Sequence, residues 1–152
     1  MKRDLFASLV FYTVFSVSGQ STNHLNTEDL RHLRLPDTAL DSVEAVAPDV
    51  QKNLQAKAYV LVTGAIGGHI RFELLLPDTW NGRFVMGGGG GFVGTIQNAA
   101  RGSINRGYAT VGTDTGHQSE QGHLAGWAHD NLEAQLNFGY LAVHRTAEVA
   151  KA

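Results

Sequence analysis

The chain has 152 residues, a net charge of −2 from 12 basic and 14 acidic side chains, and an apolar fraction of 43%. This length fits one domain, the apolar fraction excludes a disordered chain, and the balanced charge excludes the basic surface that nucleic acids and anionic membranes attract. The sequence contains no cysteine, which excludes a thiol nucleophile, thiolate metal ligands and disulfides within it.

Residues 1–19 predict a signal peptide. A basic start is followed by an apolar run over residues 5–17, too short to cross a bilayer comfortably, and then by small residues that allow cleavage before Gln20. We therefore expect a secreted or periplasmic protein with no membrane partner after cleavage. An uncleaved N-terminal anchor is the alternative.

Residues 20–57 are expected to form an N-terminal extension. Thr27 begins a short capped turn that Pro36 ends, and the mixed segment 42–54 is expected to connect this turn to the domain that follows.

Four stretches predict β-strands. Residues 58–63 and 69–76 are joined by a glycine-containing turn and predict an antiparallel hairpin, and alternating apolar and charged residues in its second strand indicate one buried face. A third strand is expected over residues 83–86, and a compact apolar one, buried on both faces, over residues 108–112.

Two helices complete the expected order. A helix weakened by Gly102 is expected over residues 95–105, and Asn131 caps a long one over residues 132–152, after a polar loop over 113–130. The fold class is therefore α/β, an antiparallel hairpin leading into a parallel sheet with flanking helices. A crossover needs a strand after the last helix, so we expect a truncated fold.

The glycine run from Gly87 to Gly91 has three interpretations. Gly89, Gly91 and Gly94 fit G-x-G-x-x-G after a strand, and Asp114 follows about 20 residues later, which is the spacing of a dinucleotide-binding module. Alternatively, the loop supplies backbone N–H groups to an oxyanion, as in α/β-hydrolases. The third interpretation is a tight turn with no ligand.

Asp114 and His117 could form a metal pair or an acid–base couple. No spacing among the histidines repeats a known zinc pattern, so no metal site is expected. The chain also contains no G-x-S-x-G segment, and a hydrolase built from it alone would lack its serine.

Ordered motifs over roughly residues 58–152 resemble the tannase and feruloyl esterase family of α/β-hydrolases. The motifs are Leu76-Pro77-Asp78-Thr79-Trp80-Asn81-Gly82-Arg83-Phe84, then Gly89 to Gly94, Gly107 to His117, and Phe138 to His144.

The resemblance implies that residues 58–152 are the N-terminal portion of a carboxylic ester hydrolase acting on small aryl or hydroxycinnamoyl esters. Such an enzyme uses a Ser-Asp-His triad and a covalent acyl-enzyme. The family's triad, and a lid holding structural calcium, would follow Ala152. The resemblance therefore places no cofactor and no triad residue in this chain, which we expect to be inactive alone.

The resemblance also assigns roles to individual residues. Gly90 and Gly91 are expected to form the oxyanion-hole loop, with Gly89 as its hinge, close to substrate. Asp114 and His117 are expected either to bind substrate or to hold the long loop by hydrogen bonds. A dinucleotide-binding module and an inert fragment remain the alternative hypotheses.

Overall fold

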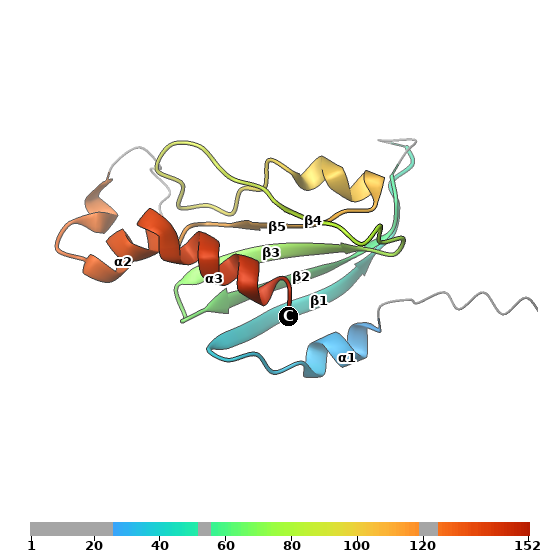
Figure 1. Ribbon diagram of the computed structural model, residues 1–152, viewed down its shortest axis with the longest axis horizontal. Helices are drawn as coiled ribbons and strands as arrows, with labels where there is room; N and C mark the ends of the chain where they lie inside the picture. Colours follow the sequence, from blue (N-terminus) through green and yellow to red (C-terminus); the bar gives the residue numbers. More distant parts are fainter. Residues whose placement is uncertain (1–25, 52–55, 119–124) are drawn as a thin grey trace, which may run out of the picture.

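The computed structural model describes residues 26–51, 56–118 and 125–152 (Figure 1). The predicted signal peptide, its cleavage point and part of the polar loop lie outside these ranges. In chain order the elements are α1 (Thr27–His32), β1 (Thr38–Val46), β2 (Tyr59–Ile66), β3 (Ile70–Pro77), β4 (Phe84–Met86), the 3₁₀ helix η1 (Arg101–Arg106), β5 (Ala109–Thr113), the 3₁₀ helix η2 (Ala125–Ala128), α2 (Leu132–Leu136), the π-helical turn η3 (Asn137–Leu141) and α3 (Ala142–Val149). In this part of the chain, no helix has the length and apolar character needed to cross a bilayer.

The strands form one sheet in the order β1-β2-β3-β5-β4. The pairs β1–β2, β2–β3 and β3–β5 are antiparallel, whereas β4 runs parallel to β5. The predicted α/β fold class, with an antiparallel hairpin leading into a parallel sheet, is confirmed, although among the described strands only β4 and β5 pair in parallel. β5 lies inside the sheet although it follows β4 in the chain, so β4 occupies an edge.

The hairpin of β2 and β3 follows the predicted alternation. Every second residue of β2 is buried, and the two strands pair continuously from Tyr59 opposite Pro77 to Ile66 opposite Ile70. Gly67 and Gly68 make the turn with φ values of 61° and 75°, a region that glycine enters without steric cost.

β1 was not predicted, because its sequence lacks an apolar alternation. It is an edge strand in which only Val43 is buried, and polar residues such as Glu44 face solvent. It nevertheless pairs with β2 along its length, with an irregularity between Leu40 and Ser42. The expected connecting segment over residues 42–54 is therefore wrong in its first half, and the sheet begins before residue 58.

The predicted helix over residues 95–105 is also wrong in its first half. Gln97 instead forms an isolated antiparallel bridge with Thr113, and the helical turns of η1 begin only at Arg101. Asn98 explains part of this difference. Its Oδ1 accepts the Ala100 N–H at 3.0 Å, a local side-chain bond that competes with helix formation.

The long C-terminal helix is confirmed. Asn131 caps it by accepting the Ala134 N–H at 3.1 Å, and α2, η3 and α3 continue without a break to Val149. The π-helical turn in its middle was not predicted. Such turns insert a residue into the α-helical ladder and re-aim the side chains around them.

Two layers cover the sheet. α3 packs on one face and η1 lies on the other, on opposite sides of β5 (Figure 1). The larger core lies beneath α3 and contains Val43, Val60, Val62, Ile66, Ile70, Phe72, Leu74, Val111 and Ala142. On the η1 side, Leu75 and Ile104 are buried. The sheet is thus covered on both faces around β5, which fixes the position of the loops that leave its carboxyl end.

Candidate active site

The residues singled out in the sequence converge at one edge of the sheet. The glycine run leaves the carboxyl end of β4, and Asp114 leaves the carboxyl end of β5. Because β4 and β5 are parallel, both segments lie at the same edge. This is the position at which α/β folds gather their ligand sites.

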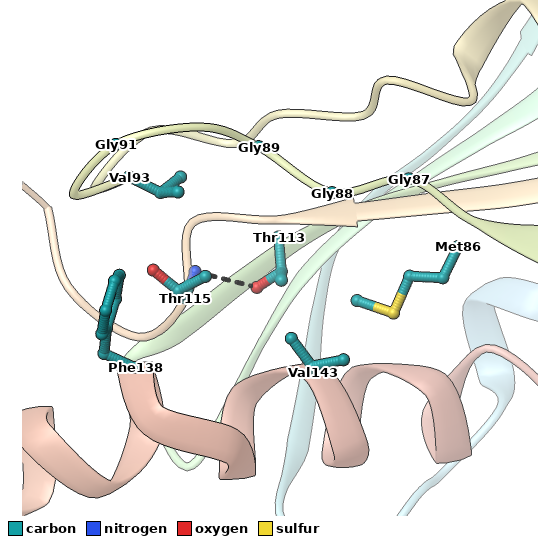
Figure 2. Close-up of a pocket in the computed structure, with 10 residues that line it drawn as sticks. All are labelled: Met86, Gly87, Gly88, Gly89, Gly91, Val93, Thr113, Thr115, Phe138 and Val143. Carbon is teal, nitrogen blue, oxygen red and sulfur yellow. Dashed lines mark hydrogen bonds between the residues drawn. The ribbon is translucent and has the colours of Figure 1, made fainter.

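A cavity of about 390 Å³ lies between these segments and the C-terminal helix. Figure 2 shows the glycine run on one side, and Phe138 and Val143, from η3 and α3, on the other. The cavity is lined by Met86, Gly87, Gly88, Gly89, Gly91, Val93, Thr113, Thr115, Phe138 and Val143. Bare backbone therefore faces mostly apolar side chains across this space.

The N–H groups of the glycine run are not equivalent. Gly87 donates to the Val111 carbonyl at 2.9 Å, and Gly90 donates to Oε1 of Gln97 at 3.1 Å. Among the described residues, the N–H groups of Gly88, Gly89 and Gly91 donate to no protein acceptor. Of the two predicted oxyanion donors, Gly91 lines the cavity, and its N–H has no acceptor in the described part of the chain. Gly90 is paired and does not line the cavity.

Close packing explains why glycine is required at part of the run. A Cβ on Gly89 would lie 2.7 Å from Oε1 of Gln97, and one on Gly87 would overlap Oδ1 of Asn98. Gly91 has open space around it but a φ of 65°. Larger residues would therefore displace the loop at the first two positions and strain its backbone at the third.

Asp114 is 1% exposed, and both oxygens of its carboxylate accept hydrogen bonds from protein donors. Oδ1 accepts the N–H groups of Arg71 at 3.1 Å and Gly116 at 2.9 Å, and Oδ2 accepts Nε2 of Gln118 at 2.6 Å. Its side chain does not line the cavity. This geometry favours the structural role foreseen for Asp114, in which it holds the turn after β5; a direct contact with substrate stays a prediction.

His117 is 6% exposed and lies in an aromatic cluster. Its ring stacks on Trp127 with centroids 3.7 Å apart, and meets Phe138 edge-on at 5.9 Å. Within the described part of the chain, neither ring nitrogen has a hydrogen-bond partner. Burial lowers the pKa of His117, and the carboxylate of Asp114 offsets part of this effect. His117 does not line the cavity but contacts Phe138, which does, so a contact of His117 with substrate also stays a prediction.

The dinucleotide-binding alternative gains no support. The fingerprint needs a helix that begins at the glycine loop, so that pyrophosphate meets its N-terminus. Here the chain after Gly94 is irregular as far as Arg101, and the carboxylate expected to bind ribose, that of Asp114, is already bonded. The described residues hold no group of three or more histidine and acidic side chains that could bind a metal ion, so we assign calcium to no residue here.

Sequence reasoning missed several residues of this site. Gln97 gave no signal, because only the fold brings its side chain beside the glycine run. Phe138 belongs to one of the family motifs, but it lies in the π-helical turn and lines the cavity, and neither feature was predicted. Thr113 and Thr115 flank Asp114 at the end of a buried strand, and that position could have indicated them.

Comparison with known proteins identifies close relatives over this region. The family model described as "Tannase and feruloyl esterase" matches residues 59–152, which confirms the resemblance seen in the motifs. A probable feruloyl esterase B of Aspergillus niger is 38% identical over 84 residues, covering 55% of this chain and 16% of the relative. An uncharacterised esterase of Xanthomonas campestris is 34% identical over 136 residues, covering 82% of this chain and 23% of the relative.

A mono(2-hydroxyethyl) terephthalate hydrolase of Piscinibacter sakaiensis is 35% identical over 97 residues, with 55% of this chain and 16% of the relative covered. Among solved structures, feruloyl esterase B of Aspergillus oryzae superposes with a TM-score of 0.70 at 24% identity, covering 82% of this chain and 27% of that one. The likeness shows a shared fold. The chain spans about a sixth of the length of several curated relatives, since it covers 16% of each.

Proposed function

The chain belongs to the tannase and feruloyl esterase family, and from this membership we propose that it forms part of a serine carboxylic ester hydrolase for aryl or hydroxycinnamoyl esters. In this proposal, the glycine run after β4 supplies backbone N–H donors to the oxyanion of the reaction. One observation carries it: Gly88, Gly89 and Gly91 line the cavity, and their N–H groups have no acceptor among the described residues.

The chemistry requires such donors. Attack of a serine on an ester turns the carbonyl oxygen into an oxyanion, first as the acyl-enzyme forms and again as water cleaves it. N–H groups held at about 2.7–3.1 Å from that oxygen stabilise both intermediates. In α/β-hydrolases, one donor comes from the loop that joins the third strand to the first helix. The glycine run, between β4 and η1, corresponds to that loop.

Gly89 and Gly91, the two residues on either side of Gly90, are the donors that we propose, and Gly88 meets the same two criteria. A role for Gly90 as a donor, predicted from the sequence, would require its N–H to leave Oε1 of Gln97 when the substrate binds. The apolar side chains of Met86, Val93 and Phe138 would contact the aryl or cinnamoyl group. No serine of the chain lies in a G-x-S-x-G segment, and the proposal assigns the triad to none of its residues.

Two proteins test this proposal: residues 20–152 alone, and the complete protein that contains them. We expect the complete protein to hydrolyse methyl ferulate or an aryl acetate, and to be labelled by a fluorophosphonate, which reacts with activated serines. Residues 20–152 should do neither. Hydrolysis by residues 20–152 at a comparable rate would place the chemistry within this chain, and a complete protein without hydrolysis would refute the esterase assignment.

Export forms part of the same proposal. The N-terminal sequence predicts cleavage before Gln20, so the mature protein should begin at that residue. Mass spectrometry of the N-terminal peptide, from protein recovered outside the cytoplasm, tests this expectation. An intact Met1 peptide in a membrane fraction would instead support the uncleaved anchor.

A further inference from the structure

The loop between β4 and η1 makes a contact that family membership does not assign. Gln97 lies beyond the glycine run, yet its side chain returns to it, since Oε1 accepts the Gly90 N–H at 3.1 Å. A backbone N–H can only donate, so the atom facing it must be the amide oxygen of Gln97. The same side chain fills the space where a Cβ on Gly89 would lie.

The backbone of Gln97 is itself fixed to the sheet. Its N–H bonds to the Thr113 carbonyl at 3.4 Å, as part of the bridge to the end of β5. Gly112 has no Cβ, and one there would overlap the Gln97 carbonyl, so the two backbones lie in close contact. Gln97 thus connects the glycine run to the strand whose Thr113 lines the cavity.

The contact with Gln97 distinguishes the Gly90 N–H from those of its two neighbours in the run. Gly90 is the one member of the run that does not line the cavity, and its N–H is the one that Gln97 accepts. Gly89 and Gly91, on either side of it, line the cavity, and their N–H groups have no acceptor in the described residues. A single side-chain oxygen therefore fixes the peptide between the two proposed donors.

We propose that Gln97 is a positioning residue for the glycine run: its Oε1 holds the Gly90 N–H away from the cavity and thereby fixes Gly89 and Gly91 as the donors. This inference rests on the proposed function for its catalytic meaning, but the contact itself can be measured without activity. Misplacing a donor by about 1 Å lowers rates by about 100-fold, so loss of the hydrogen bond between Gln97 and Gly90 should lower kcat.

The first experiment measures amide exchange with solvent by NMR in the ¹⁵N-labelled chain. Gln97→Leu and Gln97→Met remove the acceptor at similar volume, whereas Gln97→Glu keeps an acceptor oxygen. We expect the Gly90 N–H to exchange about tenfold faster in the first two variants and at the wild-type rate in the third. The Gly87 N–H, bonded to Val111, should not change.

Gln135→Leu is the matched control. Its side chain donates to the Ala128 carbonyl, far from the glycine run in the sequence, and does not line the cavity. We expect this variant to leave Gly90 exchange unchanged. Unchanged Gly90 exchange in both acceptor-free Gln97 variants would overturn the inference.

The second experiment measures ester hydrolysis by the complete protein. Gln97→Leu should lower kcat by about 10- to 100-fold and leave KM within about twofold of the wild-type value. Gln97→Glu should have a higher kcat than Gln97→Leu, because it keeps an acceptor oxygen. Wild-type kcat in both acceptor-free variants would overturn the positioning role while the esterase assignment stands. A wild-type protein that hydrolyses no ester would refute the proposed function, and the exchange rates would then decide whether Gln97 holds the loop.

Discussion

Asp114 shows how one buried carboxylate can fix the backbone beside a candidate site. It accepts hydrogen bonds from β3, from its own turn and from Gln118, and it is 1% exposed. Two of its three partners are backbone N–H groups, which would have no acceptor without it. Buried donors left without an acceptor destabilise a fold. The carboxylate therefore stabilises the fold by accepting hydrogen bonds from these N–H groups.

We therefore expect Asp114→Ala to lower the free energy of unfolding by about 2–4 kcal/mol, because it leaves the Arg71 and Gly116 N–H groups without an acceptor. Urea denaturation followed by circular dichroism measures this change. Asp41→Ala, at an exposed position of β1, is the control and should change stability by less than about 0.5 kcal/mol. Equal effects of the two substitutions would contradict the structural role of Asp114.

His117 provides a pH-dependent prediction at the same scale. Burial lowers its pKa, so in the pH range just below 6.5 the unfolded chain binds more protons than the folded one. The contribution of neutral His117 to stability is then complete above the unfolded pKa and decreases as the pH falls toward the folded pKa.

Stability should accordingly fall between pH 7.5 and pH 5.5, and His117→Phe should reduce that fall while preserving an aromatic ring against Trp127. Urea midpoints at the two pH values measure the difference. A His117→Phe variant with the wild-type pH dependence would exclude His117 as its source.

At the scale of elements, close backbone contact between β5 and the segment after the glycine run shapes the site. Gly112 allows the Gln97 carbonyl to approach β5 so closely that no side chain fits between them. Gly102 in η1, by contrast, has open space around its Cβ position. The two glycines therefore differ in what they tolerate, although both lie within regular elements.

Gly112→Ala should displace the segment around Gln97 and lower the free energy of unfolding by about 1–3 kcal/mol, the range observed for overpacking. Gly102→Ala should be neutral or slightly stabilising, because alanine restricts the unfolded chain. Thermal unfolding of the two variants compares them directly. A Gly112→Ala variant as stable as Gly102→Ala would show that β5 and residue 97 are not in close contact.

The same elements show what the sequence could predict. Strong local patterns gave correct elements, namely the alternation of the β2–β3 hairpin and the capped periodicity after Asn131. β1 escaped prediction because an edge strand with one buried residue has no such pattern. The helix expected from residue 95 failed because pairing of Gln97 with β5, a tertiary contact, overrides local propensity.

The candidate site likewise has features that the sequence could predict and features that it could not. The glycine run and its place at the carboxyl end of a strand were predictable, since sequence order and strand direction determine them. Which N–H groups of the run lack an acceptor among the described residues was not predictable, because this depends on the side chain of Gln97 reaching Gly90. The aromatic neighbours of His117, which lie 10 and 21 positions further along the chain, likewise meet it only through the tertiary fold.

The distribution of burial over the whole molecule separates core residues from exposed apolar ones. Leu75 is fully buried on the η1 side of the sheet, whereas Leu132, at the start of α2, is 68% exposed. Apolar type alone therefore does not predict a contribution to stability, since only area removed from water contributes.

Leu75→Ala should lower the free energy of unfolding by about 2–5 kcal/mol, through lost burial and the cavity it creates. The same substitution at Leu132 should cost less than about 0.5 kcal/mol, because little area is lost from the interior. Chemical denaturation of the two leucine-to-alanine variants measures this contrast directly. Similar costs would mean that the helix at Leu132 is covered in solution.

The position of β5 inside the sheet also governs the order in which the chain can assemble as it leaves the ribosome. β1, β2 and β3 can pair with one another as soon as they emerge, whereas β4 has no strand partner until Ala109–Thr113 have been synthesised. The Val111 carbonyl that holds Gly87 and the Thr113 carbonyl that holds Gln97 both arrive with that strand. The glycine run therefore reaches its final shape only once β5 has been synthesised and has inserted beside β3.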